Sequence, residues 1–242
     1  MSVTGCLENY VVVDLETTGL APASDRILEI GAVKVIGGEV KDTFCTFVDP
    51  RMEIPPHIQE LTGITQDMVK GKKTAQQAVS DFLDFCAGWD LMGHNLIFDY
   101  SFLKHQAVNQ GQSFEKSGID TLKIARSVLP ELESKSLTSL CEYYKIDRAY
   151  AHRAFHDALA THELYHHLQE TGKEEQKDLF LPKPLMYKVK RQGPITNAQK
   201  VYLKDLVKYH KIELHIDIDS LTKNEASRKI DTIISQYGRI KR

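Results

Sequence analysis

Two acidic residues close the first apolar run of the chain. The run is Tyr10–Asp14 (YVVVD), and one residue separates Asp14 from Glu16. Side chains at positions i and i+2 of a strand point to the same face, so both carboxylates should enter one small volume. Carboxylates this close disfavour each other's ionisation unless a cation lies between them. The pair therefore indicates either a site for Mg²⁺ or Mn²⁺, which prefer oxygen ligands, or a solvated strand end.

Two further aspartates are ambiguous when each is taken alone. Asp99 ends the segment Gly93–Asp99 (GHNLIFD), and Asp157 ends the segment His152–Asp157 (HRAFHD). Each aspartate lies where a helix is expected to begin, and an acid in the first turn of a helix is ordinarily explained by the helix dipole. Their combination with the pair at the strand end favours one common site.

Together the three segments resemble the DEDDh exonuclease family, the proofreading-type domain of bacterial DNA polymerase III. Asp14–Gly19 (DLETTG) resembles the D-x-E-T-T-G motif of that family. The segment ending at Asp99 resembles H-N-x-x-F-D, and His152–Asp157 resembles H-x-x-x-x-D. The segments Arg26–Val33 and Leu61–Thr65 also resemble family landmarks. The similarity is greatest to the exonuclease domains of Gram-positive-type replicative polymerases.

The resemblance implies metal-dependent hydrolysis of phosphodiester bonds. Two divalent cations, Mg²⁺ or Mn²⁺, would activate a water and stabilise the leaving oxygen. Their expected ligands are the four acids of the motifs: Asp14, Glu16, Asp99 and Asp157. His152 would take the proton from the water, because histidine titrates near neutral pH. His156 is the rival base, but the family spacing selects His152, and His156 is expected on the helix surface.

The resemblance also implies residues around the terminal nucleotide of a substrate. Thr17 and Thr18 would offer backbone or hydroxyl groups to that nucleotide. His94 and Asn95 are weaker candidates for substrate binding. Phe98 serves equally well as a substrate contact or as a core residue.

A zinc-protease pattern, H-E-x-x-H, occurs at His162–His166, on the helix expected to carry Asp157. At 100° per residue, His162 and His166 lie about 140° and about 180° away from Asp157 around that helix. The histidines, together with His167, should then lie on the outer face without a third ligand. We interpret the pattern as a solvated helix face rather than a zinc site.

The elements that must position these residues can be read from periodicity and caps. Strand composition covers Tyr10–Asp14, Ile27–Ile36, Val40–Val48 and Asp90–Gly93, and a further short strand or turn begins at Ile119. Helical signals follow Thr74, run from Phe98 to His105, and cover Thr121–Leu129, Leu137–Tyr144 and Ala154–Gln169. This order predicts an α/β fold with a mixed sheet and helices on both faces, similar to the family's ribonuclease-H-like fold. Glu29 is a polar residue inside the second strand, and we expect a structural role for it.

The chain divides into three parts by composition. We expect an exonuclease domain over residues 1–170, a linker rich in charge, glycine and proline over 171–194, and a small helical module over 195–242. Capping boxes that start at Thr196 and Thr222 predict the two helices of the module. The sequence leaves the role of this module open.

Charge is distributed unevenly along the chain. Residues 172–242 hold 16 lysines and arginines against 9 aspartates and glutamates, a balance of +7. Residues 1–171 hold 15 against 24, a balance of −9. A basic tail can contact nucleic-acid phosphates, although the same lysines can also be ordinary solvated faces.

Composition excludes several other classes of protein. The 242 residues are 42% hydrophobic and 26% charged, which suits a packed core rather than disorder. The four cysteines have no CxxC spacing, so we expect no zinc ribbon and no disulfide scaffold but a reducing, cytoplasmic setting. No apolar stretch approaches the roughly 20 residues of a membrane span, and the N-terminus lacks the pattern of a signal peptide.

The leading hypothesis is a metal-dependent 3′–5′ exonuclease that acts on single-stranded ends, DNA more than RNA, in replication proofreading or repair. A polymerase or another DNA-processing protein is a candidate partner. An RNA-trimming exonuclease would use the same chemistry and differ in recognising the ribose 2′-hydroxyl. A catalytically silent nucleic-acid-binding module is the alternative from another class, and the intact acids and His152 argue against it.

Overall fold

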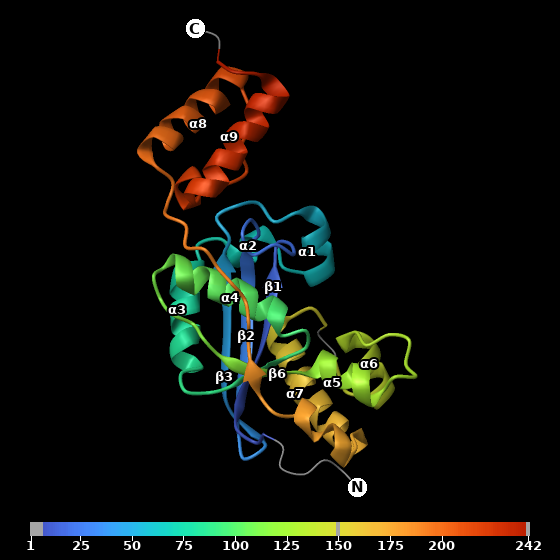
Figure 1. The fold of residues 1–242 in the computed structure, drawn as a ribbon. Helices are drawn as coiled ribbons and strands as arrows, with labels where there is room; N and C mark the ends of the chain where they lie inside the picture. Colours follow the sequence, from blue (N-terminus) through green and yellow to red (C-terminus); the bar gives the residue numbers. More distant parts are fainter. Residues whose placement is uncertain (1–6, 149–150, 241–242) are drawn as a thin grey trace.

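Within residues 7–148 and 151–240, which the computed structural model describes, a seven-stranded mixed sheet forms the centre of the molecule (Figure 1). Its strands are β1 (Tyr10–Thr17), β2 (Ile27–Ile36), β3 (Glu39–Asp49), β4 (Lys73–Thr74), β5 (Leu91–Gly93), β6 (Ser117–Asp120) and β7 (Lys183–Pro184). They lie in the order β4-β3-β2-β1-β5-β6-β7. Strands β1, β2 and β3 form an antiparallel meander, whereas β5 runs parallel to β1 and β6 parallel to β5.

Helices cover both faces of this sheet. An apolar cluster lies on each face of the sheet. Helices α3 (Ala75–Phe85) and α4 (Ile97–Asn109) contribute to the cluster on one face, and α5 (Thr121–Val128), α6 (Leu137–Tyr144) and α7 (Ala154–Thr171) contribute to the cluster on the other. Side chains alternate along β1, so Val11 and Val13 pack towards α3 and α4, whereas Tyr10 and Val12 pack towards α7. Burial on both faces explains why β1 begins with an unbroken apolar run.

A very close contact joins β2 to the start of α7. A Cβ atom on Gly31 would lie 2.1 Å from the Phe155 nitrogen and 2.2 Å from the Ala154 carbonyl carbon. Glycine is therefore required there, because any side chain would overlap the helix backbone. Gly31 lies opposite Asp14 in the β1–β2 ladder, so this contact sets how near α7 comes to the acidic end of β1.

The sequence predicts most of this architecture. The α/β class is confirmed, as are the first three strands, the helix capped by Thr74 and the helix over Leu137–Tyr144. Two short helices lie outside the prediction: α1 (Pro56–Thr62) and α2 (Gln66–Val69). Pro55 and Pro56 suggest a break in structure, but proline is well suited to the first turn of a helix, where its missing N–H has no intrahelical partner.

The expected linker, residues 171–194, contains regular structure. The 3₁₀ helix η1 (Glu174–Leu179) follows α7, and β7 pairs with β6 at the edge of the sheet. Phe180 is fully buried in the cluster beneath α7, and Tyr187 packs against the cluster on the other face. The change of charge near residue 172 therefore does not mark the end of the packed body.

The C-terminal module consists of α8 (Asn197–His210), the short 3₁₀ helix η2 (Ile218–Ser220) and α9 (Lys223–Tyr237), and it lies beyond α1 and α2 at one end of the body (Figure 1). Both predicted capping boxes form, because Thr196 accepts from Gln199 N–H and Thr222 accepts from Glu225 N–H. The helices enclose a small apolar core: Ile195, Leu203, Leu206, Leu221, Ala226, Ile230 and Ile233.

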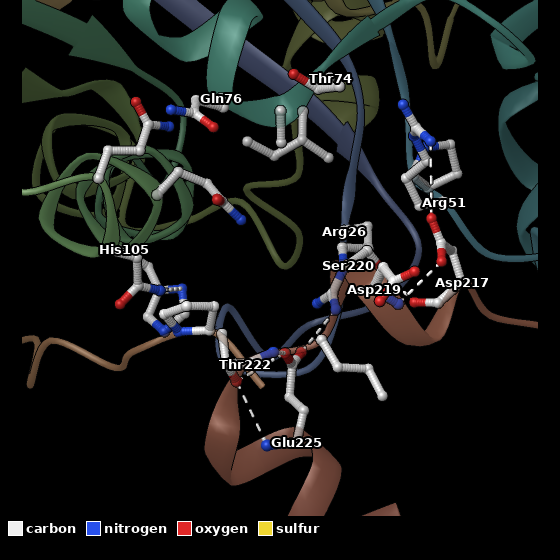
Figure 2. A pocket seen from close by; sticks show the side chains of 18 of the residues that line it. Arg26, Arg51, Thr74, Gln76, His105, Asp217, Asp219, Ser220, Thr222 and Glu225 are labelled. Carbon is white, nitrogen blue, oxygen red and sulfur yellow. Dashed lines mark hydrogen bonds and ion pairs between the residues drawn. The ribbon is translucent and has the colours of Figure 1, made fainter. Parts of the chain in front are cut away.

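A buried ion pair joins the module to the body (Figure 2). Arg26 Nη2 lies 2.7 Å from Glu225 Oε1, and the two side chains are only 11% and 8% exposed. The other oxygen of Glu225 accepts hydrogen bonds from the Thr222 N–H and hydroxyl, so one carboxylate both caps α9 and holds Arg26. A cavity of about 430 Å³ lies beside this pair, and His105 and Asn109 of α4 line its other side.

Backbone hydrogen bonds reinforce this contact. Glu53 N–H donates to the His215 carbonyl at 2.9 Å, and Asp217 N–H donates to the Arg51 carbonyl at 2.8 Å. The module is thus held by main-chain bonds as well as by the ion pair.

Two findings bear on the expectations drawn from composition. Cys45, Cys86 and Cys141 are free thiols, while Cys6 lies outside the described residues. None of the helices in the described part of the chain combines the length and apolar character that crossing a bilayer requires.

We expect Gly31→Ala to destabilise the fold by about 1–3 kcal/mol, the usual effect of overpacking. The added methyl group must push α7 away from β2. Urea unfolding followed by circular dichroism measures this loss of stability. Gly193→Ala is the matched control, because a Cβ at Gly193 meets no atom within 4 Å. Equal unfolding midpoints for the two variants would contradict this account of the contact.

Candidate active site

Asp14 and Glu16 lie on the face of β1 that meets α7. They follow Val12 in the alternation along the strand, as the i, i+2 spacing predicts. Across the β1–β2 ladder, Asp14 lies opposite Gly31 and Glu16 lies opposite Glu29. The two acids therefore share the space between the sheet and the start of α7.

Asp99 reaches the same place from the first turn of α4. It is buried, and the Leu15 N–H donates to its Oδ1 at 2.9 Å. Strand β5 runs parallel to β1 and leads into α4, so both strands deliver the chain to the same edge of the sheet. The hydrogen bond from Leu15, the residue between Asp14 and Glu16, holds the third acid beside the first two.

Helix α7 contributes the fourth acid. Asp157 is buried in its first turn, and His152 lies two residues before its start. Ligand atoms of Glu16, His152 and Asp157 all lie within 4.8 Å of one another. His152 has a φ of 60°, a left-handed conformation that is uncommon outside glycine and that surrounding structure must impose.

Burial and repulsion make these acids hard to ionise together. The pKa of Asp14 is raised well above its usual range, first by burial and then by the three neighbouring acids. Burial also raises the pKa of Asp99. For Glu16, burial and then repulsion from Asp157 and Glu29 raise the pKa to about 8. A divalent cation fits this set of residues, because carboxylate oxygens are hard ligands and its charge offsets their repulsion.

Glu29 anchors the helix that carries Asp157. It is fully buried and receives two bonds from the Arg153 guanidinium, at 2.9 and 3.1 Å. It also accepts the Ala154 N–H at 3.1 Å, and so satisfies a free donor at the start of α7. Glu29 therefore has the structural role that its place in a strand suggests, and that role fixes α7 against β2.

Much of the chain, including the acidic site, matches a known protein family. A family model described as "Exonuclease" matches residues 11–165, more than half of the chain. The chain belongs to the DEDDh exonuclease family. It is therefore a nuclease, and the ribonuclease-H-like fold expected from its motifs is confirmed.

The similar curated proteins are much longer than this exonuclease. The chain is 40% identical over 168 residues to DNA polymerase III PolC-type of Clostridium perfringens, which covers 69% of the chain and 12% of that protein. It is 38% identical over 156 residues to DNA polymerase III PolC-type of Bacillus subtilis, covering 64% and 11%. The chain thus matches about an eighth of the length of these relatives.

Solved structures with the same fold include two nucleases with ligands. Exonuclease X in complex with 5′ overhanging duplex DNA matches with a TM-score of 0.56 and 26% identity, over 71% of this chain and 99% of that one. The nuclease domain of 3′hExo bound to rAMP matches with a TM-score of 0.62 and 21% identity, over 76% and 100%. The second likeness concerns the fold alone.

The two threonines of the exonuclease motif bond within the protein. Thr17 Oγ1 donates to the Gly19 carbonyl at 2.7 Å. Thr18 N–H donates to the Arg26 carbonyl at 2.8 Å, and Thr18 Oγ1 accepts the Arg26 N–H at 2.9 Å. The turn after β1 is thus tightly closed next to Glu16, and a role of these threonines in nucleotide binding stays a prediction.

The other substrate candidates lie around the start of α4. Both ring nitrogens of His94 have protein partners, Thr121 Oγ1 at 2.9 Å and the Lys135 carbonyl at 2.8 Å, and burial lowers its pKa. Asn95 is exposed with a φ of 67°. The half-buried Phe98 packs against Phe102, with 5.1 Å between ring centroids. The His94 ring is thus held by bonds within the protein, whereas Asn95 is exposed, and substrate binding by either residue stays a prediction.

The prediction that the histidines of the H-E-x-x-H pattern share a solvated face is wrong for His162. His162 is only 9% exposed, and its Nδ1 lies 3.0 Å from the Tyr10 hydroxyl. Burial, followed by repulsion from His166, lowers its pKa to about 4. Helix α7 packs between the sheet and a second layer formed by α5 and α6, so more than one of its faces is buried. Among the described residues, the three-residue grouping suited to a metal is Glu16, His152 and Asp157, not this pattern.

Sequence reasoning misses Arg148. Its guanidinium lies inside the acidic site and forms a two-pronged bond with Asp157, Nε to Oδ1 at 2.7 Å and Nη2 to Oδ2 at 2.5 Å. Arg148 lies beyond the end of α6, in a segment without periodicity, so no local signal points to it.

Without metal, we expect the exonuclease to lose stability as the pH rises from about 5 to about 8. The folded state raises the pKa of Glu16 from 4.5 to about 8. Between about pH 5 and about pH 8, Glu16 therefore keeps its proton in the folded state but has lost it in the unfolded state. Folding then becomes less favourable as the pH rises. Thermal unfolding in chelator across this range should show a flatter slope for Glu16→Gln than for the wild type. Equal slopes would contradict the raised pKa.

Proposed function

We propose that this exonuclease removes nucleoside monophosphates from the 3′ ends of single-stranded DNA in a reaction that requires two divalent cations, Mg²⁺ or Mn²⁺. The observation that carries the proposal is the gathering of four acids from β1, α4 and α7 at the end of β1, together with one histidine from the segment before α7. When bound, the cations would activate water and stabilise the leaving oxygen. Their proposed ligands are Asp14, Glu16, Asp99 and Asp157.

His152 is the proposed general base. Its ring lies within 4.8 Å of the carboxylate oxygens of Glu16 and Asp157, so it can reach a water held among the acids. It also lies before α7 rather than within it, at the rim of the site. His156 lies inside the first turn of α7, where its ring contacts Phe155. Geometry therefore supports the assignment that the motif spacing suggests.

DNA is the proposed substrate because the similar curated proteins are DNA polymerases and Exonuclease X was solved with DNA. RNA trimming uses the same acids and remains the alternative outcome of the test below. Proofreading for a polymerase or repair by the free enzyme is a further proposal, since the chain matches only a small part of the polymerases.

Digestion of 5′-labelled single-stranded DNA and RNA tests the function. With Mg²⁺ or Mn²⁺, DNA should shorten from its 3′ end, and Asp14→Asn should nearly abolish this while leaving the fold intact. Turnover in excess chelator would contradict the metal requirement. Faster loss of RNA than of DNA would favour the trimming alternative, and binding without cleavage by the wild type would favour a silent module.

His152→Ala should slow cleavage by about 10²–10⁴, the usual range for losing a general acid or base. His156→Ala is the matched control and should change the rate much less. Single-turnover rates, measured with enzyme in excess over a labelled oligonucleotide, separate the chemical step from product release. The assignment is wrong if the two histidines exchange their effects.

We also propose that α8 retains the DNA strand during cleavage. Tyr202 and Tyr209 are 36% and 47% exposed, although both are large aromatic residues. Lys204 and Lys208 are exposed as well. At 100° per residue, the two lysines lie about 40° apart and the two tyrosines about 20° apart, and the two pairs are neighbours on the exposed half of α8. Single strands bind to aromatic side chains set among positive charges. Lys200 is less available, because it pairs with Asp219 at 2.6 Å.

Binding of a long single strand in an Asp14→Asn background tests this face. Lys204→Gln with Lys208→Gln should weaken binding and flatten its salt dependence, by about 0.7 in log–log slope for each lost phosphate contact. Lys70→Gln with Lys72→Gln removes the same charge from exposed positions on the body and serves as the control. Equal affinities and slopes for both pairs would point to a protein partner or a structural role for the module.

A further inference from the structure

A positive charge already lies in the acidic site. Arg148 and Asp157 are both nearly buried, with side chains 9% and 6% exposed, and two parallel hydrogen bonds join them. The remaining guanidinium nitrogen, Nη1, donates to Thr138 Oγ1 of α6 at 2.6 Å. Arg148 also lowers the otherwise raised pKa values of Asp14 and Glu16, so its charge acts on the whole group.

This pairing occupies both oxygens of a proposed metal ligand. A guanidinium bound side-on to a carboxylate donates one N–H to each oxygen. A divalent cation on Asp157 would then lie next to a second positive charge, and like charges in a buried site repel strongly. The pair between Arg148 and Asp157 is therefore incompatible with full coordination of a cation by Asp157.

We propose that Arg148 is a positioning residue that holds Asp157 in place while the site lacks metal and yields Asp157 when a divalent cation binds. The inference rests on the proposed metal-dependent function. The guanidinium of Arg148 balances the negative charge of Asp157, and without it Asp157 would be buried without a partner cation. Thr138 keeps a hydrogen bond to the guanidinium on the side away from Asp157, so Arg148 has an acceptor left when the pair separates.

Two consequences follow from this role, and the first distinguishes it from a purely structural ion pair. Metal must compete with Arg148, so removing the guanidinium should tighten metal binding rather than weaken it. Conversely, Asp157 loses its partner cation in the metal-free protein, so the same change should lower the melting temperature in chelator. A structural pair would give the second effect without the first.

Isothermal titration of Mn²⁺ into the metal-stripped full chain measures the competition. Arg148→Gln should lower the Kd by about 10-fold or more, the scale on which groups around the ligands tune metal affinity. Arg126→Gln removes a charge from an exposed position of α5 and is the matched control, with a Kd near that of the wild type. An unchanged or weaker Kd for Arg148→Gln overturns the proposal.

A second measurement uses the wild type and so does not depend on how the variant folds. The Nε–H of Arg148, bonded to Asp157, should give a distinct side-chain signal in ¹⁵N NMR that shifts as Mg²⁺ is added. A signal that stays in place while Mg²⁺ binds overturns the competition but leaves the metal-dependent function standing. If neither Mn²⁺ nor Mg²⁺ binds to the wild type, the proposed function fails as well.

Discussion

The crowding of four carboxylates at one end of β1 is the constraint on which the rest of the structure depends. Acids this close raise one another's pKa, and their burial raises the pKa further. No single element could hold them, so the fold brings β1, α4 and α7 to one edge of the sheet. The parallel pairing of β1 with β5 is what makes the start of α4 meet the end of β1.

Two residues of β2 that take no part in the proposed reaction position helix α7. Because Gly31 has no Cβ, the helix backbone can lie 2.1 Å from the place where a Cβ atom would be, and Glu29 binds the first residues of the helix. Both lie opposite the acids of β1 in the ladder. The position of His152 and Asp157 is thus decided by β2, and the distance between sheet and helix fixes the distance between the acids.

The module is connected to this site through the turn that follows β1. Arg26 bonds to Thr18 through its backbone. Its guanidinium bonds to Glu225 (Figure 2). Thr18 belongs to the motif proposed to bind the terminal nucleotide, so one residue lies between that motif and α9. If α8 retains a strand as proposed, that strand would be tethered close to this turn.

The sequence by itself determines what local pattern can specify. The alternation of side chains along β1 determines which of them point to each face of the sheet. Capping boxes, each a threonine followed three residues later by Gln or Glu, mark the starts of α3, α8 and α9. Three spaced motifs identify the acids. Other features depend on residues far apart in the chain: the His162 ring meets Tyr10 across 152 positions, and Arg153 meets Glu29 across 124. Arg148 is near Asp157 in sequence, but its segment has no period, so its direction follows from the packing of α6 and α7. Only tertiary structure decided these contacts, because burial of a helix face and closure of a loop depend on which surfaces meet, and no local periodicity encodes that.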